Sequence, residues 1–357
     1  MRPLGLAVVG CGRWGRNHVR VAASATNVTL VGVVDPDRAQ RDRVARDHAV
    51  TGWSHLEQAL EDPRVEAVVI ATPATTHSDL VARGLVSGRH VLVEKPAAMS
   101  VADATALVRA AQEKGVQLSA GHTFLYSRPV RNMAAWLREG APSAPWLIRS
   151  ERLGGQRRGD CSVLWNFGPH DVSLLLHLVG DPVVEVAARG HHFPGGGHLD
   201  TVTVDVTFSS GVRGEIYLGW RHAGAKRSLR LLGEDWVLRY RHGHLDGGDV
   251  MLLGGLGEGP AADAALAAGC ERDSRGALGG YGEPLRVQLE EFVAACRTGV
   301  TTLTGPNHLL AVTAVLEAAE YSAALGGLPY RLAPVAPALT APGSPLSGVH
   351  EFATEEV

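Results

Sequence analysis

The sequence of 357 residues predicts an α/β fold, with a doubly wound parallel sheet first and then an α+β unit that holds an open, mainly antiparallel sheet. The chain opens with an unbroken apolar run, Leu4–Val9, that leads into a glycine-rich turn. Short apolar runs then alternate with helical patterns, as in a parallel sheet covered on both faces. Beyond Tyr126 several runs alternate polar and apolar residues instead, as in a sheet with one covered face.

The glycine-rich turn has the pattern Gly-x-Gly-x-x-Gly, and each glycine has a physical reason. Gly10 permits the tight turn, Gly12 lets the backbone approach a pyrophosphate, and Gly15 lets the next helix pack closely on the strand. The N-terminus of that helix offers free N–H groups and a positive dipole to an anion. A glycine-rich turn of another α/β protein is the alternative, but the flanking strand and helix favour a dinucleotide site in a Rossmann fold. The candidate cofactor residues of the turn are Gly10, Gly12, Arg13, Trp14 and Gly15.

Asp35 ends the next apolar run, twenty residues after Gly15. A carboxylate at this point accepts hydrogen bonds from the ribose hydroxyls of a dinucleotide and repels a 2′-phosphate, which predicts NAD(H). Arg38 could accommodate such a phosphate, so NADP stays an alternative. A solvated position on the following helix is the interpretation of Arg38 that we favour.

The first part of the chain divides into five strands and five helices. Because ligands of such a sheet bind beyond the carboxyl ends of its strands, we expect three loops to share one edge: Gly10–Gly15, Thr72–His77 and Glu94–Pro96. The predicted strands are Leu4–Val9, Thr29–Val34, Ala67–Ala71, Val91–Val93 and Val116–Ala120. The predicted helices are Trp14–Ala25, Asp37–Asp47, Ser54–Glu61, His77–Val86 and Val101–Lys114.

The second part of the chain mixes helices with the alternating strands. We predict a dinucleotide-binding domain over residues 1–125, an α+β substrate domain over 126–332 and a flexible tail over 333–357. A Gly/Ala-rich insertion or long loop occupies about 243–282, with a short helix at Ala261–Ala268. The predicted helices are Arg128–Arg138, Leu164–Val179, Pro284–Arg297 and Asn307–Leu325. The predicted strands are Trp146–Arg152, Val183–Arg189, Thr201–Phe208, Val212–Leu218, Ser228–Leu232 and Trp236–Tyr240.

Composition argues against several other classes of function. A net charge of −3 without a basic run disfavours nucleic-acid binding. No apolar stretch reaches the length of a membrane span, and the opening run is too short for a signal peptide. The four cysteines are scattered, which disfavours a zinc site or a disulfide framework and fits a reducing cytoplasm. His191 and His192 lack further ligands at suitable spacing, so no metal is predicted.

Lys95 and His170 are the candidate catalytic residues. Moving a hydride to or from an alcohol carbon needs an acid/base beside the cofactor, because the attached oxygen loses or gains a proton. Lys95 follows the strand Val91–Val93 at the cofactor edge, and the pKa of a lysine falls readily with burial or a cationic neighbour. A solvated loop lysine and a helix histidine without chemistry are the alternatives for each residue taken alone.

Two further motifs carry a family resemblance. Glu94-Lys95-Pro96 follows the loop Thr72-Pro73-x-x-x-His77, and a later helix holds Asn166-x-Gly-x-His170. Over roughly residues 4 to 332 the chain resembles the glucose–fructose oxidoreductase / inositol dehydrogenase (Gfo/Idh/MocA) family. Residues 121–126 and 283–285 resemble the branch that acts on nucleotide-linked sugars. The loops of these motifs add Thr72, Pro73, His77, Glu94 and Lys95 to the candidate cofactor residues.

The resemblance implies that Lys95 is the acid/base and that His170 orients the substrate hydroxyl or shares its proton. Where the family usually has Asp, this chain has Asn166, four residues before His170 and on the same helix face. An amide accepts no proton, which would weaken a proton relay. The lost negative charge would also lower the pKa of Lys95 and leave more neutral amine at pH 7. We favour this second consequence, with Asn166 as a hydrogen-bonding support in the catalytic group.

Several residues could contact a substrate. His122 and Tyr126 lie where the first domain passes into the second, and Tyr281 precedes the motif at 283–285. Arg157 and Arg158 form, with Arg152, a basic loop that could bind a pyrophosphate or carboxylate or simply be solvated. The candidate substrate residues are His122, Tyr126, Arg152, Asn166, His170 and Tyr281.

Together these observations predict an NAD(P)-dependent oxidoreductase that interconverts a secondary alcohol and a ketone on a sugar, nucleotide-sugar or cyclitol. Two alternatives keep the fold: a lyase or hydrolase that uses NAD transiently, and a non-catalytic dinucleotide-sensing regulator. We expect a cytoplasmic protein with a small sugar-like substrate and neither nucleic acid nor membrane as a partner. The resemblance also implies a homodimer or homotetramer, in which the exposed face of the second sheet is buried.

Overall fold

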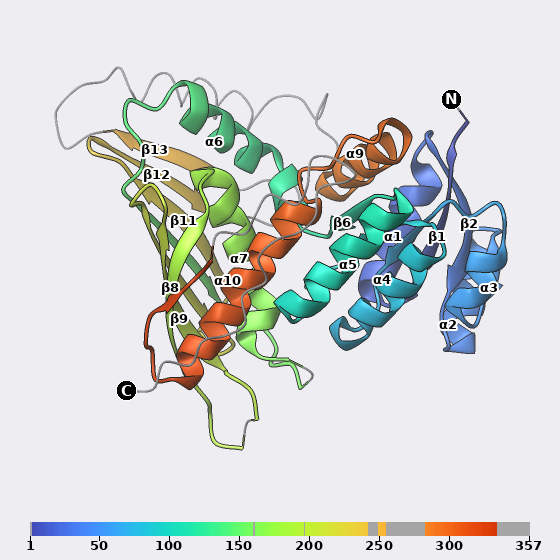
Figure 1. Ribbon diagram of the computed structural model, residues 1–357, viewed down its shortest axis with the longest axis horizontal. Coiled ribbons are helices and arrows are strands. Elements are labelled where there is room, and N and C mark those ends of the chain that lie inside the picture. Colours follow the sequence, from blue (N-terminus) through green and yellow to red (C-terminus); the bar gives the residue numbers. More distant parts are fainter. Residues whose placement is uncertain (1, 160, 196, 242–248, 255–282, 334–357) are drawn as a thin grey trace.

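The computed structural model describes residues 2–159, 161–195, 197–241, 249–254 and 283–333. Two sheets lie at opposite ends of the molecule, with helices between and around them (Figure 1). The predicted short helix at Ala261–Ala268, the candidate residue Tyr281 and the predicted tail from residue 334 onward lie outside the described residues.

The first sheet has six parallel strands in the order β3-β2-β1-β4-β5-β6, which confirms the predicted doubly wound fold. Its central strand β1 is buried at every position, as expected where helices cover both faces. The order reverses between β1 and β4, and in such sheets this switch point marks the ligand crevice. The strands are β1 (Leu4–Val9), β2 (Val28–Val34), β3 (Thr51–Trp53), β4 (Ala67–Ile70), β5 (His90–Val93) and β6 (Leu118–Ala120). The helices are α1 (Arg13–Ser24), α2 (Arg38–Asp47), α3 (Leu56–Glu61), α4 (His77–Val86) and α5 (Val101–Lys114), with short 3-10 turns η1 (Ala74–Thr76) and η2 (Thr123–Tyr126).

Strand β3 is the element of this sheet that the sequence does not predict. Its three residues include a glycine and are largely exposed, so they carry too little apolar pattern. Pairing with β2 determines the strand: a Cβ at Gly32 would lie 2.3 Å from Cζ3 of Trp53, so the indole packs directly on the Gly32 backbone. The contact between Trp53 and Gly32, and not the local sequence pattern, therefore determines that residues 51–53 form an edge strand.

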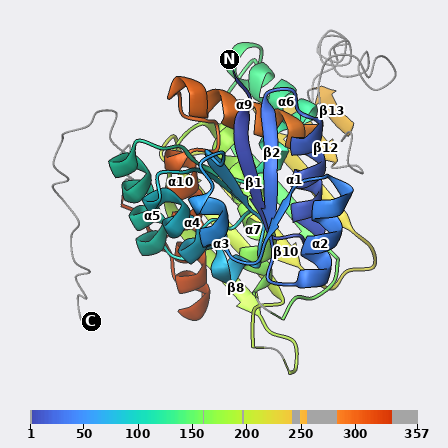
Figure 2. The same cartoon turned by 90° about the vertical axis from the view of Figure 1, so that its right-hand side faces the viewer.

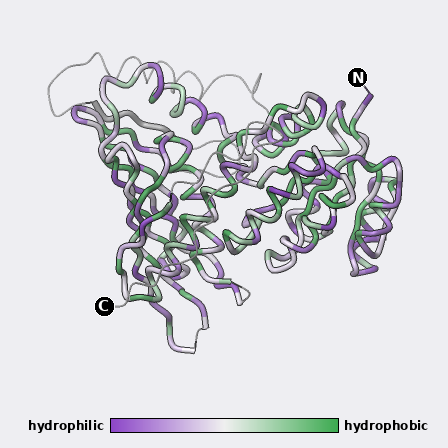
Figure 3. The backbone as a smooth tube through the Cα atoms, viewed as in Figure 1, coloured by the Kyte–Doolittle hydropathy of each residue, from purple (hydrophilic) through white to green (hydrophobic). Residues whose placement is uncertain are grey.

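The second sheet has eight strands in the order β13-β12-β11-β7-β10-β9-β8-β14. All its pairs are antiparallel except β7 with β10, so the predicted mainly antiparallel sheet is confirmed. Buried and accessible residues alternate along its strands, and Figure 3 shows the matching changes of hydropathy along the tube. The strands are β7 (Leu147–Leu153), β8 (Val183–His191), β9 (Thr201–Phe208), β10 (Arg213–Gly219), β11 (Lys226–Leu232), β12 (Trp236–Arg241), β13 (Asp249–Gly254) and β14 (Tyr330–Arg331).

Two of these strands correct the sequence interpretation. Residues 249–254 fall in the stretch predicted as an insertion or loop, yet they form β13, which pairs with β12. The neighbouring glycines obscure the short apolar run Val250–Leu253. Strand β14 has two residues, too few for any pattern, and exists because it pairs with β8.

Helices α7 (Val163–Val179) and α10 (Pro306–Ala324) cover the inner face of the second sheet, and α6 (Arg128–Glu139) lies at the end near β12 (Figure 1). One apolar cluster joins these helices to the strands. Leu309 and Leu310, at the start of α10, belong instead to the cluster beneath the first sheet. Helix α10 therefore connects the two units.

Helix α9 (Pro284–Thr298) returns to the first sheet. Its apolar residues Leu285, Leu289 and Phe292 share one cluster with Leu4 and Leu6 of β1. The turned view shows α9 beside β1 and β2 (Figure 2). This helix, which a division of the chain at residue 125 would assign to the second domain, thus completes the cover of the first.

Three further observations apply to the part of the chain that the structure describes. None of its helices combines the length and apolar composition that crossing a bilayer requires. No group of three or more His, Cys, Asp or Glu side chains is arranged to hold a metal ion. Cys11, Cys161 and Cys296 form no disulfide with one another.

Candidate active site

The glycine turn leaves an open cradle at the N-terminus of α1. Gly10 has a φ of 98°, and its added Cβ would lie 2.6 Å from the Ala71 carbonyl oxygen. At Gly15 a Cβ would lie only 1.7 Å from the Gly10 oxygen. A Cβ at Gly12, by contrast, would meet nothing within 4 Å, and no side chain caps α1. The backbone therefore needs the first and third glycines, while the space at the second fits a pyrophosphate on the free N–H groups.

Asp35 ties this turn to the end of β2. Its Oδ2 accepts the Cys11 N–H at 2.7 Å and its Oδ1 accepts the Asp37 N–H at 2.8 Å. A carboxylate has about four acceptor positions, so capacity for ribose hydroxyls remains. Arg38 points outward with 87% of its side chain exposed and pairs with Asp42. Arg38 therefore occupies a solvated position on α2, as the sequence favours.

Cys11 and Arg41 add detail that the sequence analysis lacks. Burial, and then the charge of Asp35, raises the pKa of the Cys11 thiol to about 12, so the thiol is protonated at neutral pH. Arg41 has only 14% of its side chain exposed and donates to the Asp35 carbonyl oxygen at 3.2 Å. Nothing in the helical pattern of α2 distinguishes Arg41 from its exposed arginine neighbours.

His77 joins the two other predicted loops. Its Nδ1 lies 2.7 Å from the Pro96 carbonyl oxygen and its Nε2 lies 2.9 Å from that of Thr72. The ring is buried, and both nitrogens face protein carbonyls. His77 therefore shapes this edge through the backbone of Thr72 and Pro96. Arg13 and Trp14 are exposed beside the glycine turn, at the same edge.

Glu94 lies beneath the turn and contacts α1. Its Oε1 lies 2.8 Å from Nε2 of His18, and both side chains are buried. Burial alone would raise the pKa of Glu94, but the hydrogen bond and charge of His18, with Lys95 and His77 nearby, hold it below its usual value. His18 is not predicted as a site residue from the sequence, although a polar residue on the buried face of α1 is the signal that could have identified it.

Lys95 lies where the two units meet. Its Nζ donates to the backbone oxygen of Asn166 at 2.9 Å and lies 3.4 Å from the Asn166 Oδ1. Burial lowers the pKa of Lys95 from 10.5 to about 8; Glu94 opposes the shift, and the nearby guanidinium groups of Arg152 and Arg158 assist it. Lys95 thus contacts helix α7, which also carries His170. Its partner Asn166 lies 71 positions further along the chain.

Phe124 contacts both His170 and Arg152. The centroids of the Phe124 and His170 rings are 4.6 Å apart, and the Arg152 guanidinium carbon lies 5.1 Å from the Phe124 centroid. Arg152 is itself buried and donates from Nε to Asp171 Oδ2 at 2.6 Å, and Ser150 donates to the other oxygen of the same carboxylate. The pair Arg152–Asp171 fixes α7 on β7. Asp171 adjoins His170 in the sequence, yet its partner could not be identified without the register of β7.

The remaining candidates occupy different surroundings. His122 is buried near Lys95, with its ring centroid 5.3 Å from that of His308. Burial, followed by the charges of His308 and Lys95, lowers the pKa of His122 well below its usual value. Tyr126 donates its hydroxyl to Glu291 and also contacts Thr304, so the structure does not bring this hydroxyl to Lys95.

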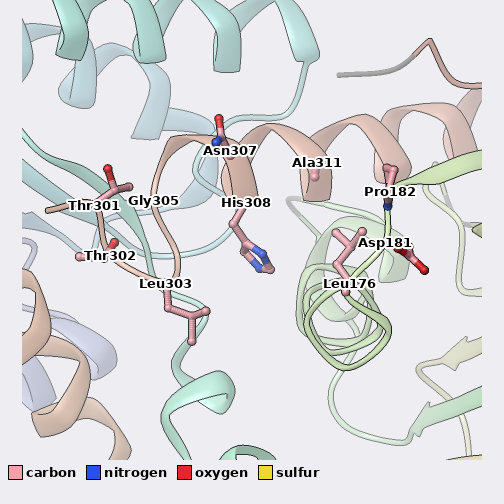
Figure 4. Close-up of a pocket in the computed structure, with 11 residues that line it drawn as sticks. Leu176, Asp181, Pro182, Thr301, Thr302, Leu303, Gly305, Asn307, His308 and Ala311 are labelled. Atoms are coloured by element: carbon pink, nitrogen blue, oxygen red, sulfur yellow. The ribbon is translucent and has the colours of Figure 1, made fainter. Parts of the chain in front are cut away.

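A cavity of about 340 Å³ lies elsewhere, between the end of α7 and the start of α10 (Figure 4). His308 and Asn307 come from α10, while Leu176 and Asp181 come from α7 and the residues after it. Neither Lys95 nor His170 lines this cavity. The cavity is therefore separate from the Lys95 cluster, although His308, which lines it, also contacts the ring of His122.

An open glycine turn at a helix N-terminus, a carboxylate at the end of the next strand and a lysine of lowered pKa at the junction of two units are the features expected of an NAD(P)-dependent oxidoreductase. Residues 4–122 match the model of an oxidoreductase family with an NAD-binding Rossmann fold, and residues 128–239 match the GFO/IDH/MocA C-terminal domain. The chain belongs to the Gfo/Idh/MocA oxidoreductase family, as the motifs predicted.

Three similar proteins illustrate the family. The chain is 27% identical to scyllo-inositol 2-dehydrogenase (NAD(+)) of Bacillus subtilis over 59% of its own length and 65% of the relative's. It is 31% identical to UDP-N-acetylglucosamine 3-dehydrogenase of Acidithiobacillus ferrooxidans over 51% of its length and 56% of the relative's. The crystal structure of GenD2 from gentamicin A biosynthesis, in complex with NAD, superimposes with a TM-score of 0.77 at 25% identity, covering 93% of this chain and 97% of GenD2. The chain thus spans less than two thirds of the two curated relatives.

Proposed function

We propose that this protein is an NAD(H)-dependent dehydrogenase that interconverts a secondary alcohol and a ketone on a sugar-like substrate, with Lys95 as the acid/base. The observation that carries the proposal is the Lys95 amine, which lies partly buried at the junction of the two units with a pKa of about 8. A relative that acts on an inositol and another that acts on UDP-N-acetylglucosamine support a sugar, cyclitol or nucleotide-sugar as the substrate class.

The residues around the glycine turn fit NAD. The open space at Gly12 and the uncapped start of α1 suit the pyrophosphate, and Asp35 suits the ribose hydroxyls. Trp14 and the loops at Thr72 and Glu94 line the same edge of the sheet. When bound, NAD supplies the nicotinamide carbon that accepts or returns the hydride of the substrate carbon.

Lys95 moves the accompanying proton. With a pKa of about 8, roughly a tenth of the lysine is neutral at pH 7, and this amine accepts the hydroxyl proton as the carbon–oxygen bond becomes a carbonyl. In the reverse direction the ammonium returns the proton. Asn166 positions Nζ through its backbone oxygen and places no negative charge beside it, which keeps the amine easier to deprotonate than a carboxylate would.

His170 and His122 are the proposed substrate contacts near Lys95. The Phe124 ring positions His170 so that it can orient the reacting hydroxyl. His122 contributes a buried Nδ1 that has no hydrogen-bond partner among the described residues. A substrate hydroxyl at this nitrogen would satisfy it.

The cofactor half of the proposal is tested by the dissociation constants of NADH and NADPH, measured by nicotinamide fluorescence. We expect NADH to bind more tightly, and Asp35→Ser to remove that preference while Arg38→Gln leaves it unchanged. Tighter NADPH binding, lost in Arg38→Gln, would transfer the choice of cofactor to Arg38. A folded protein that binds neither dinucleotide would overturn the proposal.

The reaction is tested by incubating the protein with NAD and a panel of polyols, sugars and nucleotide-sugars. We expect one class to produce NADH with stoichiometric ketone. Substrate consumption without accumulation of NADH would favour the transient use of NAD by a lyase or hydrolase. Tight NADH binding with no turnover of any class would favour the dinucleotide-sensing regulator.

A further inference from the structure

Two arginines face each other on neighbouring strands of the second sheet. Arg227 of β11 is the direct antiparallel partner of Arg152 of β7. Directly paired residues lie on the same face of a sheet with their Cβ atoms about 4.5–5.5 Å apart. Leu229 and Leu231, two and four positions beyond Arg227, are buried, so Arg227 lies on the face that α7 covers.

The two arginines differ in their partners. Arg152 is neutralised by Asp171 and lies against the Phe124 ring. Arg227 makes no hydrogen bond or ion pair with any residue that the structure describes, and its side chain is accessible. Like charges in directly paired positions destabilise a sheet. Partial burial, and then the charge of Arg152, lowers the pKa of Arg227, and Asp171 only partly compensates.

The surrounding acids are already paired. Asp171 accepts from Arg152 and Ser150, and Glu94 is bonded to His18 on the other side of Lys95. Asn166 is neutral where the family resemblance implies a carboxylate, so it adds no negative charge beside Lys95. Lys95, Arg152 and Arg227 thus lie near only two of the described carboxylates, Asp171 and Glu94, and a bound anion would supply the missing negative charge.

We propose that Arg227 binds an anionic group, a carboxylate or a phosphate, on the substrate. The inference rests on the proposed function and narrows it to acidic or phosphorylated sugar derivatives. The charge of Arg152 acts on both Lys95 and Arg227, whereas the charge of Arg227 does not act on Lys95, so we infer that the anionic group is remote from the carbon that reacts. A guanidinium binds carboxylate and phosphate oxygens in a bidentate manner, which gives orientation as well as affinity.

The test uses the full chain saturated with NADH, so that the glycine turn is filled, and measures binding by titration calorimetry. The probes are inorganic phosphate, D-glucuronate and, as the neutral match, D-glucose. We expect phosphate or glucuronate to bind more tightly than glucose, and Arg227→Gln to weaken that binding roughly tenfold. Arg230→Gln is the matched control, since Arg230 lies on the opposite face of the same strand and is exposed.

Each outcome decides the question. Phosphate binding that Arg227→Gln weakens points to a phosphoryl group, and glucuronate binding that it weakens points to a carboxylate. Failure of both anions to bind, or anion binding that Arg230→Gln weakens as much as Arg227→Gln, would overturn the inference. Because NADH affinity is measured first on each variant, a protein that binds no NADH refutes the proposed function, whereas one that binds NADH but ignores anions refutes this inference alone.

Discussion

The cofactor edge and the substrate junction of this protein are built in different ways. At the cofactor edge, Gly10, Gly12 and Gly15 lie within six residues and Asp35 follows on the next strand. The shape of this part of the site is therefore set mainly by the backbone. At the junction, Lys95 meets Asn166 from 71 positions away and Arg152 meets Asp171 across a strand and a helix. A site made of backbone turns tolerates few changes of shape, whereas a site made of distant charged side chains depends on their electrostatic balance.

The largest expected effect is at the junction. Lys95→Met should lower kcat about 1,000-fold, because the proposed acid/base is lost, while NADH affinity changes far less. The variant should also be more stable at pH 7 by roughly 3 kcal/mol, because burial of the ammonium lowers the Lys95 pKa from 10.5 to about 8. Thermal unfolding and steady-state rates measure both, and Lys114→Met is the exposed control.

The pH dependence of that stability has a definite sign. Below pH 8 the lysine is protonated in both folded and unfolded chains, so the wild type carries the full cost of the buried charge. Between pH 8 and 10.5 the folded protein loses its proton first, and the stability of the wild type rises relative to Lys95→Met. A difference that stays constant over this range would contradict the burial of Lys95.

Removing Arg152 tests whether the junction is held by buried charge. Arg152→Gln leaves the Asp171 carboxylate buried with Ser150 as its remaining donor among the described side chains, and we expect a loss of about 3–5 kcal/mol in the free energy of unfolding. Arg149→Gln, on the same strand but with an exposed partner, should cost less than about 1 kcal/mol. Urea denaturation measures both losses. Equal losses would show that the buried Arg152–Asp171 pair contributes no more to stability than the Arg149–Glu215 pair at the surface.

Two alanine substitutions test the cofactor edge. Gly15→Ala should destabilise the fold by about 2–4 kcal/mol, because its Cβ would lie 1.7 Å from the Gly10 oxygen. Gly12→Ala should fold normally, since its Cβ meets no protein atom within 4 Å, but bind NADH roughly tenfold or more weakly. Melting temperature and NADH titration separate the two effects. Unchanged NADH affinity in Gly12→Ala would place the pyrophosphate elsewhere.

The smallest expected effect comes from restoring a carboxylate beside the lysine. Asn166→Asp should raise the pKa of Lys95 by about one unit, because a negative charge beside Nζ favours the ammonium. The acid limb of the kcat/KM profile should then move to higher pH, with roughly tenfold less activity at pH 7. Asn27→Asp, at the opposite end of the sheet, is the control. A tenfold rise in kcat at neutral pH would instead show that the wild type lacks a proton relay.

The same contrast explains what could be predicted from sequence. The turn at Gly10–Gly15, Asp35 and the strands of the first sheet follow from local spacing, because their conformations are fixed within a few residues. The supporting roles of three residues could not be predicted in this way: His18, Phe124 and Asp171. Each contacts a partner that is distant in sequence and comes close only in the folded protein. Likewise, strands β3 and β13 form because they pair with β2 and β12, which the local sequence does not show. Arg227 indicates an anion site only once the sheet register places it opposite Arg152.

Helix α9 has a consequence for how the protein is made. Its residues Leu285, Leu289 and Phe292 cover the face of β1 that shows Leu4 and Leu6, yet 178 positions separate Ala120 from Thr298. At about 5–20 residues per second, a ribosome needs roughly 10–35 s to supply this cover after the last parallel strand has been synthesised. During that interval the nascent first domain presents an apolar face to the cell. A circular permutant that begins at Glu283, and so delivers α9 before β1, should yield more soluble protein in a chaperone-poor translation system.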